Sequence, residues 1–244
     1  MPLAVRVIPA ILCRGRKQVK GKQFNSWRTV GLAAQAVRVH QARGVDEVVL
    51  LDVGATPDGR GPDLQLVEEL AEVMFAPLAV GGGIRSVEDV RALLRAGADK
   101  VVIGTGGPEL IAQVSSIVGR QAVVAAVDVK GWWAHVRCGK EKTKWTPAAM
   151  AWRCADSGAG EILLTSIDRE GTMEGYDLSL ISEVCKAVDV PVVVHGGCRD
   201  YGDMADAVHA GASAVAAGAL FQFTDATPKE ASMALAGYGI EVRL

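Results

Sequence analysis

Apolar residues recur along this chain in two alternating patterns. Short, nearly continuous apolar runs rich in β-branched residues are typical of parallel strands that are buried on both faces. Between them lie longer segments with apolar residues at helical spacing. The expected strands are Val5–Leu12, Glu47–Asp52, Leu78–Gly81, Lys100–Gly104, Ala122–Asp128, Glu161–Ser166, Val192–His195 and Ala214–Ala217. The expected helices are Leu32–Ala42, Leu64–Met74, Val87–Ala96, Glu109–Val118, Pro147–Asp156, Leu178–Val188, Asp200–Ala210 and Pro228–Ala236. After the first strand we expect a long loop, Cys13–Val30.

The second half of the chain repeats the first. The stretch from Glu47 to Gly104 overlays the stretch from Glu161 to Gly218 without a gap, and several glycines, aspartates and arginines coincide. A glycine kept in both copies marks a turn with positive φ or a close approach of the backbone. Eight strands and eight helices in two equivalent halves predict an α/β fold, a (β/α)₈ TIM barrel built from two duplicated half-barrels. We expect a single domain over 1–244, with half-barrels of about 1–119 and 120–244. An open doubly wound sheet would not normally show such a repeat.

Composition changes this picture little. With 244 residues, 50% of them hydrophobic, the chain is long enough for one enzyme-sized domain. A net charge of −2 gives no reason to expect nucleic acid or an anionic membrane as a partner. The five cysteines have no metal-binding or CxxC spacing, and the first apolar run is too short to span a membrane. We therefore expect a cytoplasmic protein with reduced thiols, no metal and no other cofactor.

Glycine-rich turns follow the strands at the face where barrel enzymes carry their active sites. One cluster contains Gly82 and Gly83, and its counterpart in the second half contains Gly196 and Gly197. Such turns expose backbone N–H groups near helix N-termini, an arrangement that suits phosphate. The two clusters predict a substrate with phosphates at both ends, or with a diphosphate. The simpler alternative is that these glycines only form tight turns.

Several motifs then resemble one family, the cyclase subunit of imidazole glycerol phosphate synthase. They cover nearly the whole chain: Arg6-Val-Ile-Pro9, Val19-Lys20-Gly21, Asp46–Asp52, Val80–Asp89, Ala96–Lys100, Gly158–Ser166, Asp168–Thr172 and the C-terminal Gly-Ile-Glu-Val-Arg-Leu244. The resemblance implies a half-barrel duplication that binds a bis-phosphate ribulosyl substrate, with no cofactor. It also implies a heterodimer with a class I glutaminase, whose ammonia arrives through the barrel. The implied substrate- and phosphate-binding residues are Lys20, Gly82, Gly83, Thr105, Thr165, Gly171, Thr172, Gly196, Gly197, Gly218 and Ala219.

The family's chemistry uses two aspartates, at the ends of strands 1 and 5. The strand 5 position is Asp128, whereas the strand 1 position is Leu12, so half of the acid–base pair is missing. Cys13 is adjacent, but strand alternation directs it to the opposite face. The strand 7 end carries His195, which is either an acid–base group or a substrate contact. We therefore take Asp128 and His195 as the candidate catalytic residues.

The opposite face of the barrel matches the family's ammonia gate. Its four charged residues are Arg6, Glu47, Lys100 and Glu161, and Asp99 matches a contact to the glutaminase. We expect these residues at the N-terminal end of the barrel, as exposed ion pairs that contribute little to folding. The alternative is a ring that only stabilises the barrel.

Three functions remain open. The first is an ammonia-dependent synthase subunit of a glutamine amidotransferase that acts on a phosphorylated or nucleotide sugar, as in a paralogous branch that also carries a leucine at the first aspartate position. The second is the cyclase subunit of imidazole glycerol phosphate synthase in histidine biosynthesis. The third is a non-catalytic, phosphate-binding activator of a glutaminase. The loss of the carboxylate at Leu12 leads us to expect the first.

Overall fold

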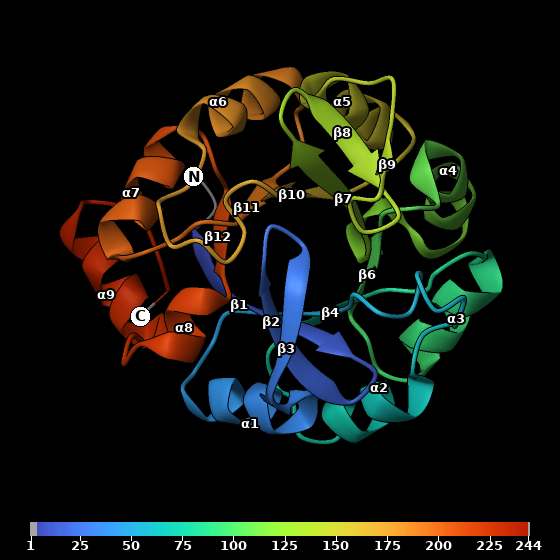
Figure 1. Cartoon of the computed structure of the whole chain (residues 1–244), viewed down its shortest axis with the longest axis horizontal. Helices are drawn as coiled ribbons and strands as arrows, with labels where there is room; N and C mark the ends of the chain where they lie inside the picture. The colour runs from blue at the N-terminus through green and yellow to red at the C-terminus, as the bar shows by residue number, and fades with distance from the viewer. Residues whose placement is uncertain (1–3, 244) are drawn as a thin grey trace.

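Eight parallel strands close into a barrel in the computed structural model, which describes residues 4–243 (Figure 1). Neighbours pair in the order β10, β11, β12, β1, β4, β5, β6 and β7, and a further pairing of β7 with β10 closes the ring. The eight strands are β1 (Arg6–Arg14), β4 (Val48–Asp52), β5 (Leu78–Gly81), β6 (Lys100–Ile103), β7 (Val123–Lys130), β10 (Glu161–Ser166), β11 (Val192–His195) and β12 (Ala214–Ala217). The expected (β/α)₈ barrel is confirmed.

Helices surround this barrel on the outside, as Figure 1 shows. They are α1 (Ala33–Ala42), α2 (Leu64–Ala71), α3 (Val87–Arg95), α4 (Gly107–Val118), α5 (Pro147–Asp156), α6 (Leu178–Ala187), α7 (Tyr201–His209), α8 (Ala219–Phe223) and α9 (Pro228–Gly237), with a 3₁₀ turn η1 (Arg120–Ala122) before β7. Most bounds lie within one or two residues of the expected ones. The short helix α8 lies outside the expected set.

The starts of the helices repeat between the two halves. Asp63 before α2 and Asp177 before α6 each accept a hydrogen bond from the backbone N–H three residues later. Ser86 before α3 and Asp200 before α7 each form a capping box with the aspartate at the third helical position. Equivalent caps at equivalent positions agree with a duplicated half-barrel, and the division near residues 119 and 120 remains a prediction.

Strand alternation divides the core in two. Every second residue faces the barrel interior, where a small apolar cluster of Ile8, Ala10, Val49, Ala79, Val102, Val124, Leu163, Val193, Ala214 and Ala216 fills the centre. The residues between them pack outward against the helices in a larger cluster that includes Cys13, Leu50 and Val101. Along β1 the inward row therefore runs from Arg6 at one end of the barrel to Leu12 at the other.

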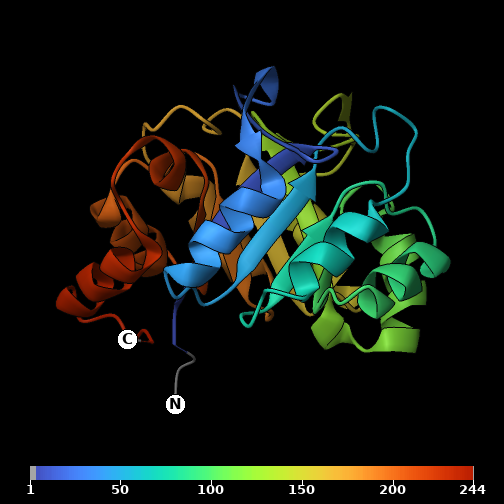
Figure 2. The same ribbon diagram turned by 90° about the horizontal axis from the view of Figure 1, so that it is seen from below.

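Two hairpins project beyond the carboxyl ends of the strands, and Figure 2 shows both rising above the barrel. The segment Cys13–Val30, expected as a long loop, instead carries most of the hairpin of β2 (Lys17–Lys22) and β3 (Asn25–Leu32). The insert after β7 forms β8 (Trp133–Val136) and β9 (Glu141–Lys142). The loop expectation was wrong because the first hairpin turns on Gln23 and Phe24, both at positive φ, rather than on a glycine or proline signal.

Within residues 4–243, the structure contains no helix that is long and apolar enough to cross a membrane.

Candidate functional site

A cleft opens at the carboxyl ends of the strands, a face that we call the mouth. The ends of β1, β7, β10 and β11 contribute Leu12, Asp128, Thr165 and His195 to it, and both hairpins supply walls. Because each of these four residues belongs to an inward-facing row, the barrel itself brings them together.

Asp128 is the candidate acid–base group in the cleft whose pKa lies near neutral pH. Burial raises the pKa of its carboxyl to about 7, and the neighbouring Thr165 hydroxyl opposes this shift. A carboxyl with this pKa can both donate and accept a proton near neutral pH. Leu12 lines the same cleft, so the position of the missing aspartate faces the cavity but offers no charge. Cys13 packs in the outer core, as expected, and burial raises the pKa of its thiol.

His195 lines the cleft but is a poor proton carrier. It is 5% exposed, and burial, aided by the charge of Lys20, lowers the pKa of its imidazole to about 3. The ring therefore stays neutral at physiological pH. This favours the expected role of a substrate contact over that of an acid–base group.

A second, smaller cavity lies beside β11 and β12. It is lined by five residues expected to bind phosphate: Gly171, Gly196, Gly197, Gly218 and Ala219. Lys20 lies against it, since a Cβ on Gly218 would come within 2.1 Å of the lysine Nζ. That Nζ is buried without a hydrogen-bond partner, and burial lowers its pKa to about 8, opposed by the charge of Glu170. A buried ammonium without a hydrogen-bond partner, beside glycine-rich turns, suits an anion.

The equivalent residues of the first half line the larger cleft. Gly82, Gly83 and Thr105 are all part of its wall. The Thr105 hydroxyl oxygen accepts a hydrogen bond from the backbone N–H of Arg137 at 3.2 Å. Thr172 is not brought to either cavity, and its hydroxyl donates to the backbone oxygen of Arg169 at 2.8 Å.

The sequence reasoning missed several residues of the cleft wall. Hairpin residues Phe24, Trp27, His135 and Cys138 line it, and so does Asp52 at the end of β4. The oxygens of Asp52 accept hydrogen bonds from the N–H groups of Gly15, Gly54 and Ala55 and from the Arg60 guanidinium. Asp52 thus holds the wall in place. Strand alternation in the insert would have pointed to His135, but only if the hairpin had been recognised.

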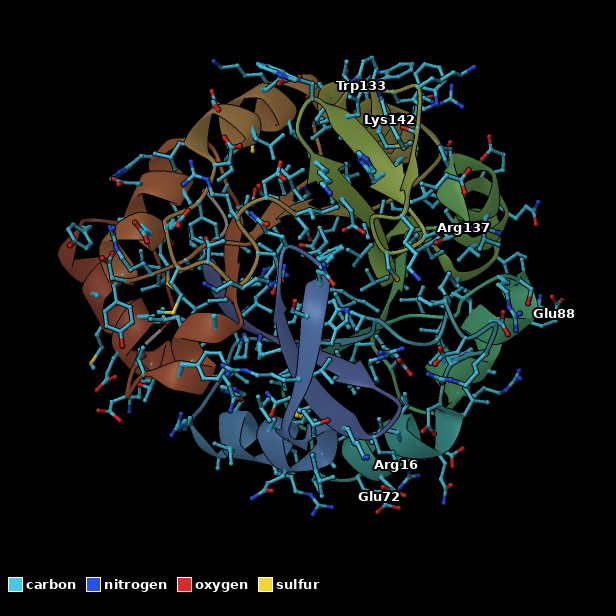
Figure 3. All side chains as sticks on the ribbon, in the orientation of Figure 1. Arg16, Glu72, Glu88, Trp133, Arg137 and Lys142 are labelled. Atoms are coloured by element: carbon cyan, nitrogen blue, oxygen red, sulfur yellow. The ribbon has the colours of Figure 1, made fainter. Side chains whose placement is uncertain are left out.

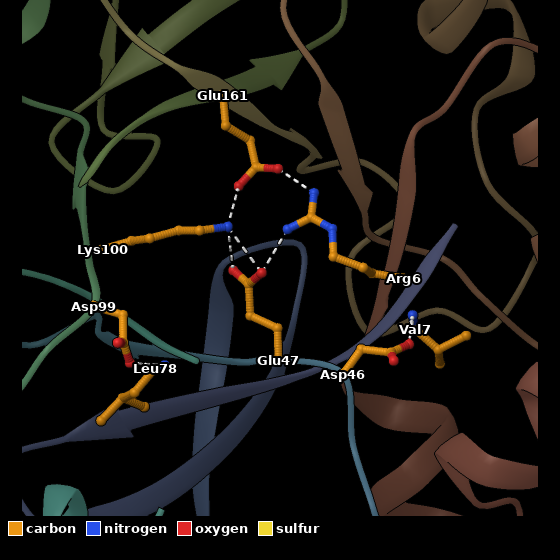
Figure 4. Close-up of polar contacts among 8 residues, drawn as sticks. All are labelled: Arg6, Val7, Asp46, Glu47, Leu78, Asp99, Lys100 and Glu161. Atoms are coloured by element: carbon orange, nitrogen blue, oxygen red, sulfur yellow. Dashed lines mark hydrogen bonds and ion pairs between the residues drawn. The ribbon is translucent and has the colours of Figure 1, made fainter. Parts of the chain in front are cut away.

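A charged ring of Arg6, Glu47, Lys100 and Glu161 occupies the opposite end of the barrel interior (Figure 4). Arg6 bridges both glutamates, and the Lys100 Nζ lies 2.8 Å from Glu47 Oε2 and 2.9 Å from Glu161 Oε2. Burial alone would lower the pKa of Arg6, but the hydrogen bonds and charges of Glu161 and Glu47 raise it above its ordinary value. Every charge of the ring is therefore paired.

The expectation that these pairs are exposed was wrong. The side chains of Glu47 and Glu161 are 2% and 8% exposed, while those of Arg6 and Lys100 are about one-fifth exposed. The two longer cationic side chains each contact both carboxylates and so help to cover them. Removing a cation would leave buried charge uncompensated, so the ring has a larger effect on folding than surface pairs have.

Asp99 lies at the rim beside this ring but has a local partner. Its Oδ2 accepts a hydrogen bond from the backbone N–H of Leu78 at 2.8 Å, and Asp46 does the same for Val7 at 3.0 Å (Figure 4). Both aspartates therefore stabilise the first residues of neighbouring strands, whatever else they contact.

Comparison with known proteins shows the family to which this chain belongs. The histidine biosynthesis protein family matches residues 6–227. The chain belongs to this family. The imidazole glycerol phosphate synthase subunit HisF of Hyphomonas neptunium is 43% identical over 249 aligned positions, covering 99% of both chains. The protein of the same name from Mycobacteroides abscessus is 41% identical over the full length of both chains.

Family membership decides between some of the expectations. The resemblance to this synthase subunit is confirmed, and so is the expectation that the chain is an enzyme of the synthase or lyase type. These relatives favour the alternative of a histidine-pathway cyclase and give no support to a sugar-aminating subunit. The roles of the individual residues remain predictions.

Proposed function

We propose that this chain is the cyclase subunit of an imidazole glycerol phosphate synthase and adds ammonia to a bis-phosphate ribulosyl substrate in its mouth. The full-length similarity to two subunits of that name supports the assignment, and Asp128 is the observation within the structure that carries it. Its carboxyl, poised near neutral pH at the end of an inward-facing row, is the group that such chemistry requires.

The two glycine-rich regions would hold the two phosphates. Gly196, Gly197 and Gly218, with Lys20 behind them, would bind one phosphate in the small cavity. Gly82, Gly83 and Thr105 would bind the other on the far side of the large cleft. A substrate held at both ends would present its middle to Asp128 and Thr165, which lie in the cleft wall between the two sites.

Ammonia addition to the carbonyl of the substrate needs proton transfers in both directions. When the nitrogen bonds to carbon, the C=O π pair moves to oxygen, which takes a proton while the nitrogen loses one. Loss of water then requires a second proton on that oxygen and a second proton from nitrogen. Protonated Asp128 can give the first proton, and its carboxylate can take a later one.

The charged ring would admit the ammonia from a class I glutaminase subunit docked on the N-terminal face. The ring surrounds the start of the interior rows, and the layers above it are apolar, with small side chains such as Ala10, Ala79, Ala214 and Ala216. A neutral molecule the size of ammonia suits such a lining better than an ion does. The complex would work in the cytoplasm, where the five free cysteines remain reduced.

The direct test supplies the purified chain with the bis-phosphate ribulosyl substrate and an ammonium salt, and measures the imidazole product. We expect product from the isolated chain and a strong loss with Asp128→Asn. Folded chain that binds the substrate but forms no product would contradict the proposal. If that chain still activated the glutaminase, the non-catalytic alternative would take its place.

A further inference from the structure

The mouth needs a second proton carrier, because Leu12 leaves Asp128 without the carboxylate that would face it from β1. Among the described residues that line the cleft, the titratable side chains besides Asp128 are Asp52, His135, Arg137, Cys138 and His195. Their surroundings decide which of them can exchange a proton near neutral pH.

Most of these candidates are excluded by their environment. The oxygens of Asp52 are engaged by three backbone N–H groups and by Arg60. Burial raises the pKa of the Cys138 thiol to about 11 and lowers that of the His195 imidazole to about 3. A guanidinium such as that of Arg137 does not give up its proton in proteins. His135 remains.

His135 lies directly opposite Asp128. The two residues are register partners in the antiparallel pair of β7 and β8. Partners of this kind point their side chains to the same face, with Cβ atoms about 4.5–5.5 Å apart. Both side chains line the cleft. Trp133, Arg137 and Lys142, labelled in Figure 3, mark the hairpin that carries His135.

A hydrogen bond fixes which ring nitrogen of His135 is free. Its Nδ1 lies 3.0 Å from the backbone oxygen of Trp133. Because a carbonyl oxygen only accepts, Nδ1 carries a hydrogen, and Nε2 of the neutral ring is the proton acceptor. The ring is partly exposed, so it can meet a substrate in the cleft.

The charged groups around His135 are few. Asp128 faces it from β7, Lys142 is its partner on β9, and Arg137 follows at the hairpin turn. The Lys142 ammonium is turned away and lies 4.1 Å from the centre of the Trp133 ring. Asp128 is thus the acidic residue directly opposite His135 in the pair of β7 and β8.

We propose that His135 is the second acid–base group of the mouth and, in the ammonia-adding reaction proposed above, exchanges protons through Nε2 in concert with Asp128. As the nitrogen attacks, Nε2 takes a proton from it, and the Asp128 carboxyl gives one to the carbonyl oxygen. The imidazolium then protonates the resulting hydroxyl, water leaves as C=N forms, and the Asp128 carboxylate takes the second proton from nitrogen. Both side chains return to their starting states.

The test compares His135→Gln with the unaltered chain, using the bis-phosphate ribulosyl substrate and ammonium salt. Glutamine can keep a hydrogen bond to the Trp133 oxygen but carries no exchangeable charge. We expect kcat to fall about 10²–10⁴-fold with KM nearly unchanged. The pH dependence of kcat should lose one of its two limbs, because a single titrating group remains. The control is His209→Gln, an exposed histidine on α7 remote from the cleft, which should leave turnover unchanged.

A second variant separates chemistry from folding. Added imidazole should restore part of the turnover of His135→Ala in proportion to its concentration, which a purely structural role of His135 would not allow. If His135→Gln turns over within about threefold of the unaltered chain, or if its pH profile is unchanged, this inference is overturned while the proposed function stands. If the unaltered chain forms no product, the proposed function fails, and this inference fails with it.

Discussion

The two ends of the barrel handle charge in opposite ways. At the N-terminal end, two cations and two carboxylates neutralise one another in the charged ring. At the mouth, the Nζ of Lys20 and the Oε2 of Glu170 are buried without hydrogen-bond partners. Each of these two side chains is stabilised by the opposite charge of the other, but a buried polar atom without a hydrogen bond is costly. Two such atoms at the mouth indicate where a charged ligand completes the structure. The inward-facing residues of a single strand run from one end of the barrel to the other, as from Arg6 to Leu12 on β1.

The largest effect that we expect is the loss of turnover when Asp128, at the mouth, is substituted. Asp128→Asn preserves size but removes the proton carrier, so turnover with ammonium salt should fall about 10²–10⁴-fold. Substrate affinity, measured by calorimetry, should stay within about threefold, because the glycine-rich turns hold the phosphates. Turnover equal to that of the unaltered chain would show that Asp128 takes no part in the proton transfers.

The same substitution should change how stability depends on pH. The carboxyl of Asp128 has a pKa raised from 3.8 to about 7, so between these values the folded chain binds more protons than the unfolded one. Stability from this group is therefore lost as the pH rises from about 4 to 7. Asp128→Asn should be more stable than the unaltered chain at pH 8, by an amount on the order of 2–4 kcal/mol, and nearly equal to it at pH 4. Urea unfolding at both pH values measures this, and a pH-independent difference would contradict the burial of the carboxyl.

At the ring, loss of a cation should destabilise the fold. Lys100→Met leaves Glu47 and Glu161 with Arg6 as their remaining cation in the ring. We expect a loss of about 1–3 kcal/mol, less than for a fully buried pair because Lys100 is one-fifth exposed. Glu69→Gln, which breaks an exposed pair with Arg16, should change stability by less than about 0.5 kcal/mol. Equal unfolding midpoints for the two variants would mean that the ring is no more than a set of surface pairs.

Substitution of Lys20, at the mouth, should stabilise the ligand-free chain, whereas substitution of Lys100 destabilises it. Lys20→Met removes a buried ammonium that has no hydrogen-bond partner, and it also removes the attraction between Lys20 and Glu170. The first effect exceeds the second, so the ligand-free chain should gain on the order of 1 kcal/mol. The pKa of Lys20 is lowered to about 8 from 10.5, so the gain should be present below pH 8 and disappear as the pH rises past 10.5. Thermal unfolding without ligand measures this, and phosphate should stabilise the unaltered chain more than the variant. A destabilised variant would show that Lys20 has a structural partner.

The difference between the ends also explains what could be predicted from the sequence. The barrel strands were found almost to the residue because burial on both faces leaves continuous apolar runs, and parallel alternation then places Arg6, Leu12 and Asp128 correctly. The burial of Glu47 and Glu161 was missed, since the depth of a side chain depends on its neighbours in space.

The hairpins of the mouth were harder to predict. The strands of the first hairpin are partly exposed, β9 has only two residues, and the turn at Gln23 and Phe24 uses positive φ without glycine. His135 was missed for the same reason, because its relation to Asp128 exists only once the register of β7 and β8 is known. His195 was singled out by its position at a strand end, but the position could not reveal that the ring is buried.

One measurement tests most directly whether the charged ring admits ammonia while the mouth carries out the chemistry. The chain and a class I glutaminase are assayed together with either glutamine or ammonium salt as the nitrogen source. Lys100→Met should lose glutamine-dependent turnover severalfold more than ammonium-dependent turnover, whereas Asp128→Asn should lose both equally. Equal losses with both nitrogen sources in Lys100→Met would contradict the account, and the charged ring would then be a stabilising feature alone.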